Sequence, residues 1–358
     1  MTLGEITTRE ELQSYLYAAL QLEHATIPPY LVALYSMHPG KNSDAYNIIR
    51  AVLVEEMLHL TLVANIMNAV GGSPDLTTPG FVPTYPTHLP DGEDDFTVDL
   101  RPFSMAAIDT FLKIERPAKA PDEQSRLVES PAGVKVLGTS PTAPGMHFYS
   151  IGEFYAEIDR GISSLAQTYG DDLFCGDPQR QVGPEYFYSG GGEIVPVTDL
   201  ASAQAAVRQI SEQGEGYSGG IYDEGDEIAH YYRFQQLKLG RYYLHGDKAD
   251  APTGPALAVD WNAVYQVKVS ARLTDYPKGS ELETAAEEFN RDYAGILRLI
   301  TQAYNGAPQL LHEAVWAMFR LRNQAIRLIH NPIDGRHGVH ASPTFEMTET
   351  SGVLEVAR

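Results

Sequence analysis

The sequence predicts a mainly all-α protein, built on a four-helix bundle with a long crossover and a C-terminal helical extension. Two observations lead to this prediction. Apolar residues recur at helical spacing over several long segments, which begin at capping residues and end at glycines. Glutamate and histidine also recur along these segments in a regular order. We expect the bundle to span residues 1–247, with its crossover at 71–148, and the extension to span 248–358.

The first predicted helix starts at Thr8, whose spacing to Glu11 is that of a capping box. Apolar residues recur every three or four positions through 12–27, so one face of this helix can be buried. Pro28 and Pro29 follow. Because proline lacks a backbone N–H and clashes with the preceding turn, we expect the helix to kink or to restart there.

The second predicted helix is capped by Asn42 or Ser43, runs to residue 70 and ends at two glycines. It is apolar on nearly all sides, which is typical of a helix that is buried on most faces. Glu55 and Glu56 lie inside it, and buried carboxylates need a compensating partner. The crossover is rich in proline and glycine, and we expect in it one strand at 96–100 and one short helix at 105–115.

The second half of the chain alternates between helical patterns and irregular stretches. A third bundle helix is predicted at 150–169 and, after a Gly/Pro-rich excursion, a fourth at 223–245. Another irregular stretch precedes two helical patterns at 279–304 and 308–330. We expect this pair to pack on the bundle as an extension, and the tail after it to wrap the surface or cover a site.

Two of the predicted bundle helices carry glutamate and histidine three residues apart. The pairs are Glu56 with His59 and Glu227 with His230. Residues with this spacing share one helix face, with Cβ atoms about 5–6 Å apart, which suits ligands of a shared metal ion. One such pair arises often by chance, so the order of the pairs along the chain matters more than either pair alone.

The other two bundle helices each supply one candidate glutamate, and the residues around Glu23 are strongly apolar. Along the chain the order is a lone glutamate, Glu-x-x-His, the crossover, a lone glutamate and a second Glu-x-x-His. Four-helix bundles that hold two metal ions have these ligands on their helices. The six expected ligands are Glu23, Glu56, His59, Glu153, Glu227 and His230.

Several of these positions have alternatives. Glu55 adjoins Glu56 but lacks the three-residue offset to the histidine. Ser150 and Glu153 also fit a capping box at the start of a helix, and Glu157, one turn later, is the reserve ligand. Five tyrosines lie near the expected ligands in the sequence, and core packing is the favoured interpretation for them: Tyr30, Tyr149, Tyr155, Tyr231 and Tyr232.

Charge and ligand type indicate which metals suit such a site. Four ionised carboxylates balance two divalent cations, whereas the same acids without metal would be desolvated like charges with raised pKa values. Cys175 is the only cysteine, which excludes a thiolate cluster and an intrachain disulfide. Oxygen and imidazole ligands suit iron or manganese. We expect two iron ions, with manganese as the alternative, and ligand type alone does not exclude zinc.

The composition narrows the class of partner. The formal net charge of −21 over 358 residues argues against binding to nucleic acid or to an anionic membrane surface, since both rely on clustered Lys and Arg. The N-terminal residues lack the basic and apolar segments of a leader, and no apolar run approaches the ~18 residues of a membrane span. We therefore expect a cytoplasmic protein, and its sequence is compatible with a homo-oligomer.

Four stretches resemble a known family: LQLEHATIPPYLVALYS, VEEMLHLTLVANIMNAVGG, YSIGEFYAEI and DEIAHYYRF, with HASPTFEM as a looser match. They are similar to the ferritin-like domain at the terminus of the violacein-pathway iminophenyl-pyruvate dimer synthase and in standalone bacterial proteins. The resemblance covers about 10–245 and implies a ferritin-like four-helix bundle with the same six ligands. The pathway role does not transfer, because the dimer synthase is a much larger chain.

The expected function is that of a non-haem di-iron oxidoreductase. It would act with O2 or peroxide on a small organic substrate, and secondary metabolism is one setting for such chemistry. A ferroxidase or iron-handling protein and a dimanganese catalase-like enzyme are the alternatives. The long crossover and the C-terminal extension would obstruct packing into a storage cage, which favours the oxidoreductase.

Overall fold

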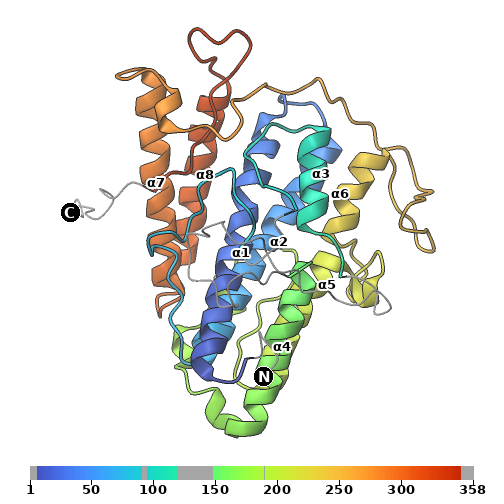
Figure 1. Cartoon of the computed structure of the whole chain (residues 1–358), viewed down its shortest axis with the longest axis vertical. Coiled ribbons are helices and arrows are strands. Elements are labelled where there is room, and N and C mark those ends of the chain that lie inside the picture. The colour runs from blue at the N-terminus through green and yellow to red at the C-terminus, as the bar shows by residue number, and fades with distance from the viewer. Residues whose placement is uncertain (1–5, 91–94, 119–147, 189, 348–358) are drawn as a thin grey trace.

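The computed structural model describes residues 6–90, 95–118, 148–188 and 190–347, and it is helical, with isolated β-bridges in place of strands over these ranges (Figure 1). The all-α prediction is confirmed. The strand expected at 96–100 does not form, because the pairing there is a single bridge between Thr87 and Val98. Parts of the predicted crossover and of the predicted tail lie outside the described residues.

The helix α1 spans Arg9–Ser36 and begins at the predicted capping box of Thr8 and Glu11. It continues through Pro28 and Pro29 without a break, so the expected restart does not occur. Proline leaves the carbonyl four residues earlier without its helical donor. For Pro29 that carbonyl belongs to Ala25, and the hydroxyl of Tyr85 donates to it at 2.8 Å. A tertiary hydrogen bond therefore replaces the bond that the proline removes.

Three more helices complete the bundle with α1. They are α2 (Ser43–Ala69), α4 (Ile151–Tyr169) and α5 (Leu200–Glu215), and neighbouring helices pack as α1 on α2, α2 on α5, α5 on α4 and α4 on α1. The α5 segment lies in the stretch that is predicted from the sequence to be an irregular excursion. This assignment was wrong, because α5 buries a narrow stripe that starts with the small residues Ala203 and Ala206 and gives a weak apolar signal.

Two short helices lie beyond the ends of α4 and α5. They are α3 (Met105–Ile114) and α6 (His230–Leu239), which pack against each other, and α6 also packs on α2 and α5 (Figure 1). The helix predicted at 223–245 is thus much shorter. Asp226 has a φ of 67°, and residues before α6 form a turn closed by a bridge between Tyr222 and Ile228.

The ends of α3, α4, α5 and α6 meet at one level of the molecule. The carboxylate of Glu215, the last residue of α5, accepts the backbone N–H of Gly152 in α4 at 2.7 Å and of Ala118, just after α3, at 2.9 Å. One side chain therefore joins three chain segments at this junction.

The helices α7 (Glu281–Ala303) and α8 (Leu310–Ile329) form an antiparallel pair, and α8 packs on α1. In the view of Figure 1 the pair lies on the opposite side of α1 from α3 and α6. Both helices form where the sequence predicts them. Over the described ranges, the helices are too short or too polar to cross a membrane.

Asn65 provides a test of how the bundle holds the segment between α4 and α5. Its fully buried amide donates to the carbonyls of Val182 and Val195 at 2.9 and 3.2 Å, and its carbonyl accepts the N–H of Val182 at 2.9 Å. Asn65→Ala should lower the free energy of unfolding by about 2–4 kcal/mol, because each buried polar group left unsatisfied costs about 1–3 kcal/mol. Urea denaturation measures this change.

Asn47→Ala is the matched control, because Asn47 lies on the exposed side of the same helix. We expect it to change the free energy of unfolding by less than about 0.5 kcal/mol. Equal effects of the two substitutions would contradict the role given to Asn65.

Candidate metal centre

Four of the residues expected from the sequence lie together in the interior of the bundle. They are Glu23 on α1, Glu56 and His59 on α2, and His230 at the start of α6, and each is at most 2% exposed. His59 Nδ1 lies 3.4 Å from Glu23 Oε2 and 3.9 Å from Glu56 Oε1. His230 Nδ1 lies 3.0 Å from Glu56 Oε1, and the two imidazole rings are 5.4 Å apart.

Glu115 is a further member of this cluster, and it is not among the ligands expected from the sequence. It caps the C-terminal end of α3, is 4% exposed, and places Oε2 3.5 Å from His230 Nδ1. Two buried groups of three result, Glu23 with Glu56 and His59, and Glu56 with Glu115 and His230. Within each group the ligand atoms lie within 4.8 Å of one another, and Glu56 belongs to both.

Each carboxylate of the cluster accepts a hydrogen bond from a buried hydroxyl. These bonds hold one oxygen and leave the other directed toward the histidines. The donors are Tyr155 to Glu23, Thr26 to Glu56 at 2.8 Å, and Tyr30 to Glu115. Burial, and then the adjacent carboxylates, hold the pKa values of both tyrosines well above the usual range, so the phenols keep the protons that they donate.

The histidines are fixed from outside the cluster through their other ring nitrogen. His59 Nε2 is hydrogen-bonded to Gln213 Oε1 at 2.8 Å, and His230 Nε2 to Glu55 Oε2 at 2.8 Å. Arg233 lies 3.3 Å from Glu55 and balances its charge. Such partners orient metal-binding imidazoles and set their tautomers. In both rings, Nδ1 is the nitrogen that faces the carboxylates.

Protons compensate the buried charge when no cation is present. Burial, and next the charge of Glu115, raise the pKa of Glu56 to about 7. Burial alone would lower the pKa of His59, but the Glu23 carboxylate outweighs it and the pKa is raised. Burial is likewise outweighed at His230, where neighbouring carboxylates, first that of Glu115, hold the pKa well above its usual value.

The residues present fit a pair of divalent cations. His230 Nδ1 is buried, and the carboxylate oxygens around it make no well-directed hydrogen bond to it. Glu115 sits at a helix C-terminus, where the helix dipole disfavours an anion and favours a cation. A cation about 2.1 Å from each ligand needs ligand atoms about 3–4 Å apart, which small side-chain shifts would provide here. The oxygen and imidazole donors suit iron, manganese or zinc.

The structure does not bring Glu153 and Glu227 into the cluster. Glu153 is in the first turn of α4, where its carboxylate accepts the N–H of Tyr149 at 3.2 Å while Ser150 caps the helix. Glu227 precedes α6, so it shares no helical face with His230, and its side chain is 75% exposed. The reserve residue Glu157 is paired with Arg160 on α4 and also lies outside the cluster.

A cavity of about 590 Å³ adjoins the cluster between α2, α5 and the loops around residues 191 and 225. Glu55, Gln213 and Arg233 line it, so the residues that hold the histidines separate the cluster from the cavity. Gly191 has a φ of 98°, and a Cβ there would lie 2.7 Å from Glu55 Cγ. Glycine therefore allows the loop to approach the residues that support the cluster.

Substitution of Glu115 should distinguish the cluster found in the structure, which contains Glu115, from the ligand set expected from the sequence, which contains Glu153 and Glu227. Glu115→Gln should lower the metal content after anaerobic reconstitution from about two ions per chain to about one, because it removes a charged ligand from one of the two groups. Elemental analysis of iron, manganese and zinc measures this. Glu153→Gln and Glu227→Gln are the controls and should retain two ions. The reverse pattern would contradict the cluster described here.

The raised pKa values predict that the stability of the metal-free protein falls with rising pH, whereas the stabilisation by added metal grows. A group whose pKa is higher in the folded than in the unfolded state stabilises the fold fully at pH values below its unfolded-state pKa. This stabilisation is lost as the pH rises toward and through its folded-state pKa. For Glu56 the loss occurs between pH 4.5 and about 7. Metal-free protein should therefore melt at a lower temperature at pH 8 than at pH 6. Stabilisation by added Zn²⁺ should grow over the same range, since metal must displace the protons. Calorimetry at several pH values measures both melting temperatures. An increase in melting temperature on adding Zn²⁺ that is the same at every pH would contradict the prediction.

Comparison with known proteins places the fold in a family. Residues 16–239 match the profile of the ferritin-like family. Dichlorochromopyrrolate synthase of Lentzea aerocolonigenes is 28% identical over an alignment of 334 residues. The match covers 85% of this chain and 30% of that protein, so the chain spans less than a third of its relative. The crystal structure of a ferritin-like protein from Caulobacter vibrioides has a TM-score of 0.62 at 24% identity and covers 90% of this chain and 96% of its own. The chain belongs to the ferritin-like family.

Proposed function

We propose that this protein is a non-haem di-iron oxidoreductase that uses O2 or peroxide to oxidise a small organic substrate. The observation that carries the proposal is the sharing of Glu56 between two buried groups, each with one histidine that is fixed from outside. A carboxylate between two cations about 3.5–4 Å apart is the arrangement of two-metal catalytic sites. A purely structural cation would not need a second position beside it.

The residues around the cluster would perform distinct tasks. Bound iron ions would supply the electrons for the reduction of O2 or peroxide. The hydroxyls of Tyr30 and Tyr155 hold carboxylate oxygens in place and are the nearest phenolic protons. Gln213 keeps the ring of His59 oriented, and Glu55 does the same for His230. Burial of all these groups excludes bulk water from the reacting centre.

We place the organic substrate in the 590 Å³ cavity, where one layer of side chains, Glu55, Gln213 and Arg233, lies between it and the cluster. Carboxylates predominate over guanidinium groups on its walls, so neutral or amine-bearing molecules should enter more readily than anions. The Lentzea relative is named as a synthase of a small molecule, which supports an organic substrate in secondary metabolism. Its particular product is not carried over, because this chain spans only 30% of that protein.

Oxygen uptake by the Fe(II)-loaded protein tests the proposal. Wild-type protein should consume O2 rapidly, and Glu56→Ala should slow this by about 100-fold or more because it removes the shared ligand. Glu153→Gln is the control and should retain the rate. An oxygen electrode with stopped-flow absorbance measures both.

Excess metal distinguishes the alternatives. The proposed oxidoreductase should stop oxidising iron after about two ions per chain, unless an organic substrate and a reductant are supplied. Continued oxidation of many equivalents would indicate an iron-handling protein, and O2 release from hydrogen peroxide by the manganese-loaded form would indicate a catalase-like enzyme. Either result would replace the proposal.

A further inference from the structure

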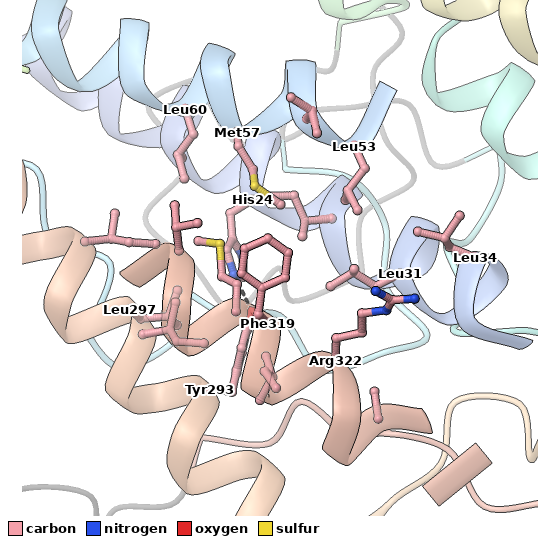
Figure 2. A pocket seen from close by; sticks show the side chains of 18 of the residues that line it. His24, Leu31, Leu34, Leu53, Met57, Leu60, Tyr293, Leu297, Phe319 and Arg322 are labelled. Atoms are coloured by element: carbon pink, nitrogen blue, oxygen red, sulfur yellow. Dashed lines mark hydrogen bonds between the residues drawn. The ribbon is translucent and has the colours of Figure 1, made fainter. Parts of the chain in front are cut away.

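A second cavity of about 230 Å³ lies between the pair α1 and α2 and the pair α7 and α8 (Figure 2). It is bounded by the faces of α1 and α2 that point away from the metal centre. On α2, for example, Leu53, Met57 and Leu60 line the cavity, whereas Glu56 and His59 face the cluster. The cavity is therefore a separate site, and its occupant would not contact the proposed metal ligands.

The interior of this cavity is apolar apart from one buried polar pair. Leu31 and Leu297 are among the aliphatic side chains that Figure 2 shows around it. His24 Nε2 is hydrogen-bonded to the hydroxyl of Tyr293 across the cavity wall. The imidazole is 2% exposed, and its Nδ1 has no hydrogen-bond partner within the described residues. An unpartnered buried nitrogen on a cavity wall indicates space that a ligand or water can fill.

Two arginines line the cavity where it opens to solvent. Arg50 on α2 and Arg322 on α8 are exposed, and in the described part of the chain neither is paired with a carboxylate. Both arginines are close enough to Tyr35 to act on its ionisation. Burial raises the pKa of Tyr35 to about 12, and the positive charges of Arg322 and Arg50 oppose this rise. The Arg322 guanidinium is 6.0 Å from the centre of the Tyr35 ring. The mouth is thus positively charged in a protein whose net charge is −21.

Exposed aromatic side chains adjoin the same opening. Phe319 and Tyr188 line the cavity while remaining 43% and 61% exposed, and their rings meet edge to face. Trp316, 62% exposed, packs against Phe319 at a ring distance of 5.8 Å. Exposed aromatic groups around an apolar cavity are typical of ligand-binding sites.

We propose that this cavity binds an amphipathic monocarboxylate, with its apolar chain between α1, α2, α7 and α8 and its carboxylate at Arg50 and Arg322. Charge complementarity selects an anion, and the small apolar interior of about 230 Å³ selects an unbranched chain or a single aromatic ring over a peptide. At roughly 30 Å³ per water-sized group, the volume accepts about eight such groups. A medium-chain acid is therefore the expected size.

The test uses decanoate and decanol as probes with the full-length protein. Trp261 stacks on Phe103, so Trp261→Phe leaves Trp316 beside the mouth as the only tryptophan. In this background, decanoate should change the fluorescence of Trp316 and bind at least about tenfold more tightly than decanol, because a charge-assisted hydrogen bond is lost in the alcohol. Metal-loaded and chelator-treated protein should give the same affinity.

Three further variants complete the experiment. Arg50→Gln combined with Arg322→Gln should weaken decanoate binding by about tenfold and abolish the preference over decanol, whereas Arg320→Gln, on the same helix but outside the cavity, should change neither. Leu31→Phe, which adds no tryptophan to the background, should weaken the binding of both probes by narrowing the cavity. The proposal would be overturned if the parent protein bound the two probes equally, or if the double variant bound decanoate as tightly as the parent. It would also be overturned if the affinity for decanoate depended on metal, because the carboxylate would then lie at the metal centre.

Discussion

Three carboxylates buried within a few ångströms of one another are the constraint on which this structure depends. Glu23, Glu56 and Glu115 have no lysine or arginine among the partners that hold them in the described residues. Desolvated like charges of this kind are unstable unless protons or cations compensate them. Buried hydroxyls hold each of these carboxylates, and partners outside the cluster hold the two histidines, so the charged groups stay close together in the interior.

The junction of helix ends makes the cluster possible. In the lower half of the molecule α4 and α5 pack against α1 and α2, and in the upper half α3 and α6 take their place (Figure 1). Glu115 ends α3 and His230 begins α6, so both reach the interior from helix termini. The carboxylate of Glu215 accepts hydrogen bonds from the backbone just after α3 and from the first turn of α4. A bundle of four uninterrupted helices could not supply ligands in this way.

The predictable part of the site follows from helix length. Glu23, Glu56 and His59 lie in the middle of long helices, where spacing along the sequence fixes which side chains share a face, and the structure brings them together. Glu227 and His230 have the same spacing, but the turn before α6 removes the helical register that the prediction requires.

Glu115 and α5 were missed for related reasons. Glu115 follows a short helix inside a Pro/Gly-rich crossover, and its signal was an acid at the end of an apolar helix directly before Arg-Pro. The α5 segment is polar on most sides and follows a Gly/Pro-rich stretch, so its low apolar content hides a short buried stripe that does recur at helical spacing. Tertiary packing, rather than local sequence, decides both features, whereas the long amphipathic pair α7 and α8 could be predicted closely.

The two halves of the cluster differ in how firmly the backbone holds them. Glu23, Glu56 and His59 are anchored in the middle of helices of 28 and 27 residues, whereas Glu115 and His230 stand at the ends of helices of 10 residues each. Helix termini yield more easily than helix centres. One position is thus preformed and the other compliant, so in the proposed two-metal centre the ions should load in sequence, and the second should exchange faster than the first.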